Sequence, residues 1–190
     1  MLITVEGVDG AGKTTLARKL GEKLGAEVLR EPGGVEVSER IRALVQDPAL
    51  EVDPRAEALL NAAARAQLIA ERIRPLLREG RPVVLDRFTD SSLAYQGGGR
   101  GLEVREINAF ATGGLRPDVT LLLRVDPRTA RARKDGAPDR LEAEPDAFFA
   151  AVADAYDALA AAEPDRFRVL DASLPADEVL RAALHALGET

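Results

Sequence analysis

A glycine-rich loop at residues 7–14 constrains the fold of this chain more than any other feature. It reads Gly-Val-Asp-Gly-Ala-Gly-Lys-Thr, the complete G-x-x-x-x-G-K-[ST] pattern of a phosphate-binding loop. An apolar run at 2–5 precedes it and leucines at helical spacing follow it, so the loop joins a strand to a helix. Backbone N–H groups in such a loop point at phosphate oxygens, and the helix dipole adds positive potential. The motif predicts binding of a nucleoside triphosphate; the alternative is a glycine turn that only connects strand to helix.

Length and composition exclude several classes of protein. The 190 residues, 46% apolar and 31% charged, are typical of one globular domain spanning 1–190. The net charge of −6 argues against a surface that coats nucleic acid, and no apolar run approaches the roughly 20 residues of a membrane helix. With no cysteine and a single histidine, His185, disulfides, thiolate metal sites and histidine-dependent triads are not expected. Met1 leads directly into a predicted strand without a signal peptide, and we expect a cytoplasmic protein.

Short apolar runs alternate with longer helical patterns, as in a parallel sheet covered by helices. Strands are predicted at 2–6, 26–29, 82–86, 119–125 and 167–171, and helices at 13–24, 36–46, 54–78, 103–112, 126–133, 145–162 and 175–187. The segment 91–101 is rich in glycine, hydroxyl and amide groups and is interpreted as a loop suited to recognising a base edge. The expected fold is α/β, a three-layer α/β/α sandwich with a five-stranded parallel sheet and helices on both faces.

Asp86 and Arg87 close the strand predicted at 82–86. Because such sheets bind ligands at the carboxyl ends of their strands, we expect Asp86 to face the loop at 7–14. There the Asp86 carboxylate and the Thr14 hydroxyl would hold Mg²⁺, and Arg87 would bind a phosphate through two N–H groups. The alternative is a charged residue that merely ends a strand.

Arginines in three other segments are candidates for ligand binding. Arg30 lies in the turn 30–34 after the second strand. Asn61 and Arg65 are four residues apart and share one face of the helix 54–78, a pattern equally typical of a solvated helix face.

A cationic cluster surrounds the turn-rich segment near 134–139; its members are Arg131, Arg133, Lys134 and Arg140. A phosphoryl-transfer site needs such charge and profits from a closing loop that excludes water. The cluster predicts a lid at about 131–142, against the alternative of a solvated charge run.

Several motifs distributed from end to end resemble bacterial thymidylate kinases. They are EGVDGAGKTT (6–15), REPGG (30–34), DRFTDSSLAYQ (86–96), PDVT (117–120) and DRLE (139–142). The first motif is shared by many P-loop kinases, whereas the second and third are much more specific. The resemblance implies a P-loop kinase fold with a lid, transfer of the γ-phosphate of ATP to dTMP, a Mg²⁺ cofactor, a homodimer, and no nucleic-acid or membrane partner.

The resemblance also implies roles on the donor side. The implied ATP-binding residues are Gly7, Val8, Asp9, Gly10, Ala11, Gly12, Lys13, Thr14, Thr15, Arg131 and Arg133, and the metal is implied at Thr14 and Asp86. Lys13 would hold the β- and γ-phosphates. Because positions 8–11 contain no arginine, the chain resembles the subgroup whose catalytic arginines come from the lid, and Arg140 fits that role.

On the acceptor side, the implied substrate-binding residues are Asp9, Arg30, Asn61, Arg65, Arg87, Ser92 and Gln96. Asp9 would hold the 3′-hydroxyl, Arg87 the acceptor phosphate and Arg65 a pyrimidine carbonyl. Ser92 and Gln96 would contact the base or its phosphate. The implied catalytic residues are Asp9, Lys13, Arg87 and Arg140.

The sequence departs from the family pattern at several positions. Asn61 stands where the family usually has a phenylalanine that stacks on thymine, a contact worth roughly 1–3 kcal/mol per base. Val35 replaces a threonine, Arg124 an aspartate, and Ala151 and Ala153 arginines. The departure at Asn61 keeps open a kinase for another nucleoside monophosphate or a small phosphorylated metabolite. A nucleotide-dependent switch is less favoured because no N-K-x-D motif is present.

Overall fold

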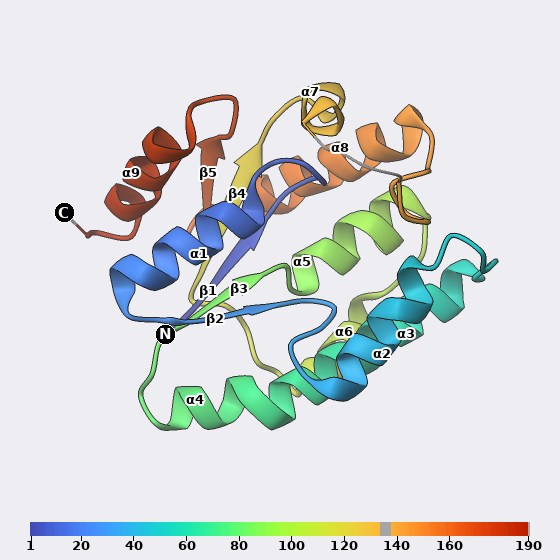
Figure 1. Ribbon diagram of the computed structural model, residues 1–190, viewed down its shortest axis with the longest axis horizontal. Helices are drawn as coiled ribbons and strands as arrows, with labels where there is room; N and C mark the ends of the chain where they lie inside the picture. Colours follow the sequence, from blue (N-terminus) through green and yellow to red (C-terminus); the bar gives the residue numbers. More distant parts are fainter. Residues whose placement is uncertain (134–137, 190) are drawn as a thin grey trace.

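Five parallel strands form the central sheet of the computed structural model, which describes residues 1–133 and 138–189 (Figure 1). The strands are β1 (Leu2–Glu6), β2 (Glu27–Arg30), β3 (Val83–Asp86), β4 (Val119–Arg124) and β5 (Phe167–Asp171). Their order is β2-β3-β1-β4-β5. Each lies within one residue of the predicted strand, so the expected α/β fold with a five-stranded parallel sheet is confirmed.

The register of the sheet brings the ends of three strands to one edge. Val5 pairs with Asp86 between β1 and β3, and Arg30 pairs with Asp86 between β2 and β3. The loop that follows β1 and the turn that follows β2 therefore begin at the same edge, beside Asp86.

The helical segments are α1 (Lys13–Leu24), α2 (Glu36–Gln46), α3 (Pro54–Leu68), the π-helical turn η1 (Ile69–Ile73), α4 (Arg74–Arg78), α5 (Thr89–Ser92), the π-helical η2 (Leu93–Gly99), α6 (Arg105–Thr112), α7 (Pro127–Ala132), α8 (Asp146–Ala162) and α9 (Ala176–Ala186). Crossover connections between parallel strands are right-handed. The connection from β1 to β2 therefore lies on one face of the sheet. The connections from β2 to β3, from β3 to β4 and from β4 to β5 run in the opposite direction across the sheet and lie on its other face. Accordingly, α1 and α9 lie together on one side of the sheet, and α4 and α8 cover the other (Figure 1).

The long helix predicted at 54–78 forms as three continuous pieces. Asp53 is its N-cap and accepts hydrogen bonds from the backbone N–H groups of Arg55 and Ala56. Pro75 has no N–H to donate to residue 71, and the π-helical turn η1 directly precedes the piece that contains it. The wider turn thus accommodates the proline within a continuous helical segment.

The interpretation of 91–101 as a loop is wrong for most of its length, because α5 and η2 make residues 89–99 helical. The glycines there permit close packing on α8. A Cβ on Gly98 would lie 2.5 Å from the Cβ of Ala155, and one on Gly99 would lie 2.4 Å from the ring of Phe148. Glycine has low helix propensity, so the local pattern gave no sign of a helix that packing against α8 stabilises.

Three aromatic residues of α8, Phe148, Phe149 and Tyr156, are buried in the core. Phe88 is fully buried and does not line the cavity described below. His185 is exposed on α9.

Part of the predicted lid, residues 134–137, lies outside the described residues. None of the described helices combines the length and apolarity needed to cross a bilayer.

Candidate functional site

A cavity of about 690 Å³ opens at the carboxyl edge of the sheet. The predicted site residues that line it are Asp9, Gly10, Gly12, Lys13, Thr14, Thr15, Arg30, Asn61, Arg65, Asp86, Arg87, Ser92 and Gln96. The donor-side and acceptor-side residues therefore share one cavity. Gly7, Val8 and Ala11 belong to the loop but do not line the cavity.

The loop owes its shape to its glycines. Gly7, Gly10 and Gly12 have φ values of 140°, 81° and 96°, in the region that L side chains rarely adopt. A Cβ on Gly10 would lie 2.0 Å from the carbonyl oxygen of Ala130, so the loop also packs directly on α7. Gly12 is the N-cap of α1 and supplies no side-chain hydrogen bond. The first N–H groups of α1 are therefore left for an anion at the mouth of the loop.

Lys13 is buried beneath the loop, where its Nζ donates a hydrogen bond of 2.8 Å to the carbonyl of Val8. Burial, followed by the nearby charge of Arg87, lowers the pKa of Lys13 to about 8. The ammonium group is therefore still charged at neutral pH. A bound anion would offset the burial that disfavours this charge.

Thr14 and Asp86 form a pair that fits a divalent cation. The Thr14 hydroxyl donates to Asp86 Oδ2 at 2.6 Å, while Asp86 Oδ1 is buried and has no hydrogen-bond partner in the described chain. Hard cations such as Mg²⁺ take oxygen ligands and commonly use one or two carboxylates together with substrate phosphates. Within the described ranges no group of three or more His, Cys, Asp or Glu residues could hold a metal, so phosphate oxygens would complete such a site.

Arg87 and Asp9 face each other across the sheet edge. Arg87 Nη2 forms a salt bridge with Asp9, whose other carboxylate oxygen accepts a 2.7 Å hydrogen bond from the Tyr95 hydroxyl. The guanidinium also lies 4.9 Å from the centroid of the Tyr95 ring. Arg87 has φ 71° and is the one non-glycine residue with positive φ in the described part of the chain. Such strained positions occur at functional sites, where their surroundings hold them in place.

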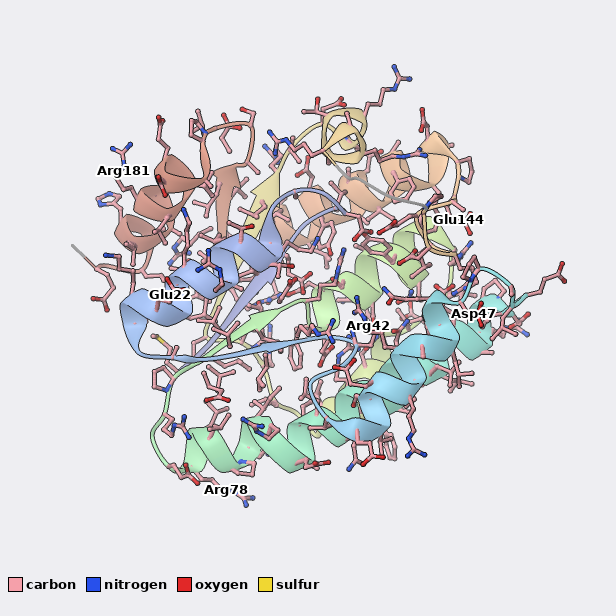
Figure 2. The ribbon with its side chains drawn as sticks, viewed as in Figure 1. Glu22, Arg42, Asp47, Arg78, Glu144 and Arg181 are labelled. Carbon is pink, nitrogen blue, oxygen red and sulfur yellow. The ribbon has the colours of Figure 1, made fainter. Side chains whose placement is uncertain are left out.

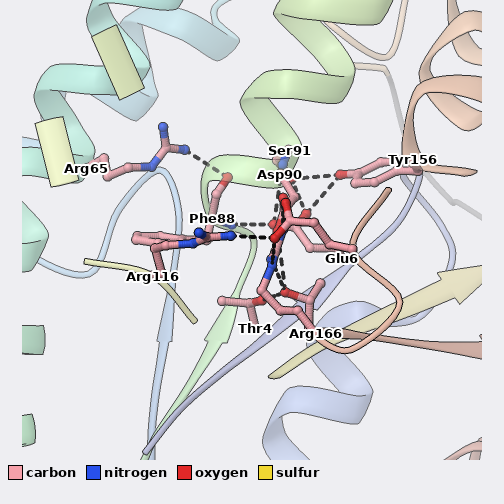
Figure 3. A network of polar contacts seen from close by, with 11 residues as sticks. Thr4, Glu6, Arg65, Phe88, Asp90, Ser91, Arg116, Tyr156 and Arg166 are labelled. Carbon is pink, nitrogen blue, oxygen red and sulfur yellow. Dashed lines mark hydrogen bonds and ion pairs between the residues drawn. The ribbon is translucent and has the colours of Figure 1, made fainter. Parts of the chain in front are cut away.

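A buried carboxylate supports the turn that carries Arg87. Glu6, at the end of β1, accepts hydrogen bonds from the Phe88 N–H at 2.7 Å, the Ser91 hydroxyl at 2.6 Å and the Tyr156 hydroxyl at 2.9 Å (Figure 3). Burial, then the charge of Asp90, raises the pKa of Glu6 to about 7. The network ties β1, α5 and α8 together directly behind the cavity.

Arg65 points into the protein, so the solvated-face interpretation of its helix does not apply. Its side chain is 3% exposed. Nε donates to Glu31 at 2.7 Å, Nη1 donates to Ser92 at 3.1 Å and to Asn108, and Nη2 donates to the Phe88 carbonyl at 2.9 Å. A guanidinium has five N–H donors, so one N–H on Nη2 remains. Because Arg65 lines the cavity, that donor is the one available to a ligand.

Sequence reasoning missed Arg42, which lines the same cavity as Arg30. Arg42 lies on the side of α2 that faces the centre of the molecule (Figure 2), and it donates a 3.0 Å hydrogen bond to the Pro32 carbonyl. Burial, then the charge of Arg30, lowers the pKa of Arg42. Arg42 shares a helix face with Ser38 and Val45, four residues before it and three after it, and both are buried in the structure. The sequence shows this spacing but not the burial.

Tyr95, Glu31 and Gln46 also line the cavity and were not predicted. Tyr95 escaped notice because its helix was interpreted as a loop. Glu31 is buried, and burial raises its pKa to about 7 against the opposing effect of Arg65.

The structure does not bring two of the predicted lid arginines to the cavity. Arg131 pairs with Asp146 and lies 5.2 Å from the centroid of the Phe149 ring, which directs it toward α8. Arg133 donates to the Ala172 carbonyl at 2.7 Å, after β5. Arg131 therefore contacts α8 and Arg133 contacts the residue that follows β5, and neither lines the cavity.

Arg140 lies at the rim of the cavity. Its Nη2 forms a 2.6 Å salt bridge with Glu57 of α3, and its Nε donates at 2.8 Å to the Val45 carbonyl at the end of α2. The neighbouring residues Asp139 and Leu141 line the cavity, whereas Arg140 does not. Arg140 therefore attaches its segment to α2 and α3, next to the acceptor half of the cavity.

A local partner accounts for one departure from the family pattern, because Arg124 forms a 2.6 Å salt bridge with Asp157 of α8. A second departure has no such partner: Val35 is the N-cap of α2 and offers no side-chain hydrogen bond, which a threonine could supply.

The cavity combines three features: a phosphate loop with a buried lysine, a facing carboxylate on the neighbouring strand, and several arginines in its other half. Together they define a P-loop kinase that acts on small phosphorylated molecules. The comparisons with known proteins specify which one. The family model for thymidylate kinase matches residues 5–183, and the chain belongs to the thymidylate kinase family.

Relatives from several bacteria match nearly the whole chain. The thymidylate kinase of Deinococcus radiodurans is 49% identical over 189 residues, covering 94% of this chain and 92% of the relative. That of Leifsonia xyli is 50% identical over 190 residues, covering 94% and 90%. The crystal structure of thymidylate kinase from Ehrlichia chaffeensis superposes with a TM-score of 0.83 at 29% identity, covering 99% of this chain and 98% of that one.

Proposed function

We infer that the protein transfers the γ-phosphate of ATP to dTMP, giving ADP and dTDP. The observation that carries this conclusion is the single cavity that joins the loop at Lys13 to Arg65 and Gln96. A phosphate donor and a base-recognition surface must face one another for direct transfer, and one cavity supplies both.

The reaction needs positioning more than proton transfer. A phosphate oxygen of dTMP attacks the γ-phosphorus in line, and the bond from that phosphorus to the β-γ bridging oxygen breaks. The attacking oxygen is already ionised, so no strong general base is required. Bringing two polyanions together requires charge neutralisation, which Lys13, Arg30, Arg42 and Arg87 provide around the cavity.

On the donor side, we propose that the loop N–H groups and Lys13 hold the β- and γ-phosphates. Thr14 and Asp86 would hold Mg²⁺, which when bound neutralises charge on the transferring phosphoryl group. The unpartnered Oδ1 of Asp86 supports this assignment.

On the acceptor side, we propose that Arg87 and Arg42 bind the dTMP phosphate and that Asp9 binds the 3′-hydroxyl. The remaining N–H of Arg65 would donate to a base carbonyl. Ser92 acts through Arg65, to which it is hydrogen-bonded. The engagement of Arg30 with Glu39 through two hydrogen bonds makes Arg30 a secondary contact.

An acceptor panel tests the function. Phosphorylation of dTMP, dUMP, CMP, UMP and GMP is measured by a coupled ADP assay at fixed ATP. We expect dTMP to give the highest kcat/KM. A different best acceptor would establish the alternative, a kinase for another monophosphate. ATP turnover that needs no small-molecule acceptor would point to a switch protein.

The variant Asn61→Phe is expected to bind dTMP more tightly than the wild type. Asn61 lines the cavity one helical turn before Arg65, where an aromatic ring would lie against the base. Stacking worth roughly 1–3 kcal/mol corresponds to a fall of about fivefold to about 150-fold in Kd, measured by isothermal titration calorimetry. Asn61→Leu, which adds apolar surface without a ring, is the control. Equal or weaker binding by Asn61→Phe would show that the protein already supplies this contact elsewhere.

We further propose a homodimer located in the cytoplasm, where ATP and dTMP are found. Exposed apolar side chains on α3 and on the two helices that contact it support association, namely Leu59 on α3, Val37 and Leu44 on α2, and Phe110 on α6. Phe110 is 90% exposed. Sedimentation velocity should give twice the mass of the chain, and a monomer at micromolar concentration would exclude the assignment.

A further inference from the structure

Glu57, a carboxylate buried between α3, η2 and the segment of Arg140, has no role in the steps above. Its side chain is 0% exposed, and its two oxygens receive three hydrogen bonds. We propose that Glu57 is a specificity-determining positioning residue, which holds the amide of Gln96 so that its carbonyl oxygen faces the base of the acceptor. This inference rests on the proposed function, and it names a residue that makes the acceptor site selective for the base.

The orientation of the Gln96 amide follows from hydrogen-bond valence. Gln96 lies 2.8 Å from Glu57 Oε1. An ionised carboxylate only accepts hydrogen bonds, so the amide atom facing it must be the donor Nε2. The other amide atom, Oε1, is then the one available to a molecule in the cavity, which Gln96 lines. A neutral partner at position 57 would accept either orientation of the amide.

Two arginines pair with Glu57 and hold its carboxylate in place. Arg100 Nη2 donates to Glu57 Oε2 at 3.1 Å and Arg140 Nη2 donates to the same oxygen at 2.6 Å. With Oε2 occupied by both guanidinium groups, Oε1 is left for Gln96. A buried carboxylate needs such partners to remain ionised.

The resulting pattern matches one class of pyrimidine. Arg65 presents a donor and Gln96 presents an acceptor, and both line the same cavity. Thymine and uracil carry a carbonyl at C4 and an N–H at N3, which complement this order. Cytosine carries an amino group at C4 and an unprotonated N3, which oppose both groups. A site built to hydrogen-bond one pattern rejects the reverse strongly because its buried polar groups are left unpaired.

The test compares Glu57→Gln with the wild type on dTMP and dCMP. We expect the ratio of kcat/KM for dTMP over dCMP to fall by at least about tenfold, because the Gln96 amide can then turn its donor toward the base. A purely structural role of Glu57, or an effect through Arg140, would lower kcat/KM for both substrates by the same factor and leave their ratio unchanged. That result would overturn the proposal.

Matched variants test whether Glu57 acts on selectivity through Gln96. Glu57→Asp keeps an acceptor-only group and should retain a ratio much closer to that of the wild type. Glu144→Gln removes the other acid that pairs with Arg100, at 2.6 Å, and should not change the ratio. In a Gln96→Leu background, Glu57→Gln should have no further effect on the ratio, whereas a second independent drop would contradict action through Gln96.

A measurement on the wild type does not depend on any variant folding. With dTMP labelled with ¹⁵N at N3, the imino proton should be protected from exchange when bound, because Gln96 Oε1 accepts its hydrogen bond. Rapid exchange in the bound state would overturn the assignment. A wild type that prefers another acceptor would instead refute the proposed function, so the two failures are distinguishable.

Discussion

Replacing Lys13 with alanine is expected to lower kcat by a factor on the order of 10²–10³, the loss typical of removing one preorganised cation or donor from charge that develops in a transition state. Lys13 lies beneath the phosphate loop, and its ammonium group donates a 2.8 Å hydrogen bond to the Val8 carbonyl. Steady-state rates with dTMP and ATP measure the effect. Residual activity above about a tenth of the wild type would contradict the role of Lys13.

The same substitution should not unfold the protein. Burial lowers the pKa of Lys13 from 10.5 to about 8, which means that the folded state disfavours its charge relative to the unfolded state. At pH 7 the ammonium therefore opposes folding, and as pH rises from about 8 toward 10.5 that cost is relieved. Removing the cation is expected to leave Tm unchanged or higher, with an unaltered circular dichroism spectrum. Lys23→Ala, on the exposed last turn of the same helix, is the matched control and should change neither activity nor Tm.

Replacing Arg140 with alanine is expected to lower kcat by at least about 100-fold while KM for dTMP changes little. Arginines that meet the transferring phosphoryl group act mainly on the transition state and contribute about 10³–10⁵ in related phosphoryl transfers. Positions 8–11 of the loop contain no arginine, and Arg131 and Arg133 are engaged away from the cavity, which leaves Arg140 as the candidate on this segment. To act in this way, the guanidinium must exchange Glu57 for phosphate oxygens when ATP binds, and Arg100 then remains as the arginine that occupies Glu57 Oε2.

A different outcome would assign Arg140 a structural role. Its contacts with Glu57 and the Val45 carbonyl fasten the segment to α2 and α3. If the alanine variant keeps its kcat but loses thermal stability, or if only its KM rises, Arg140 serves to hold its segment on α2 and α3. Arg128→Ala is the control, because Arg128 is 83% exposed on α7 and should leave both constants unchanged.

Much of the donor half of the site was predictable. The spacing of the loop specifies a strand before it and a helix after it, and nearly continuous apolar runs identified the other strands. Since parallel strands end at one edge, the sequence alone predicts that Asp86 faces the loop that carries Thr14, and the two residues are hydrogen-bonded. These predictions depend on local pattern and on the geometry of parallel sheets alone.

The acceptor half was harder to predict. Tyr95 was missed because η2 is held helical by packing against α8, which no local propensity reveals. The solvated-face alternative for Arg65 could be discarded only when Glu31, Ser92 and Asn108 were seen around it. These partners come from other elements of the chain, at sequence separations of 27 to 43 residues.

The sequence by itself determined the phosphate loop, the parallel sheet and the edge at which ligands bind, because these follow from periodicity and glycine conformation within short windows. Only the tertiary structure decided how the side chains are oriented around the acceptor. The direction of the Gln96 amide depends on Glu57, whose position depends in turn on Arg100 and Arg140. Such a network exists only when distant elements exclude water together, since burial is what makes each hydrogen bond obligatory.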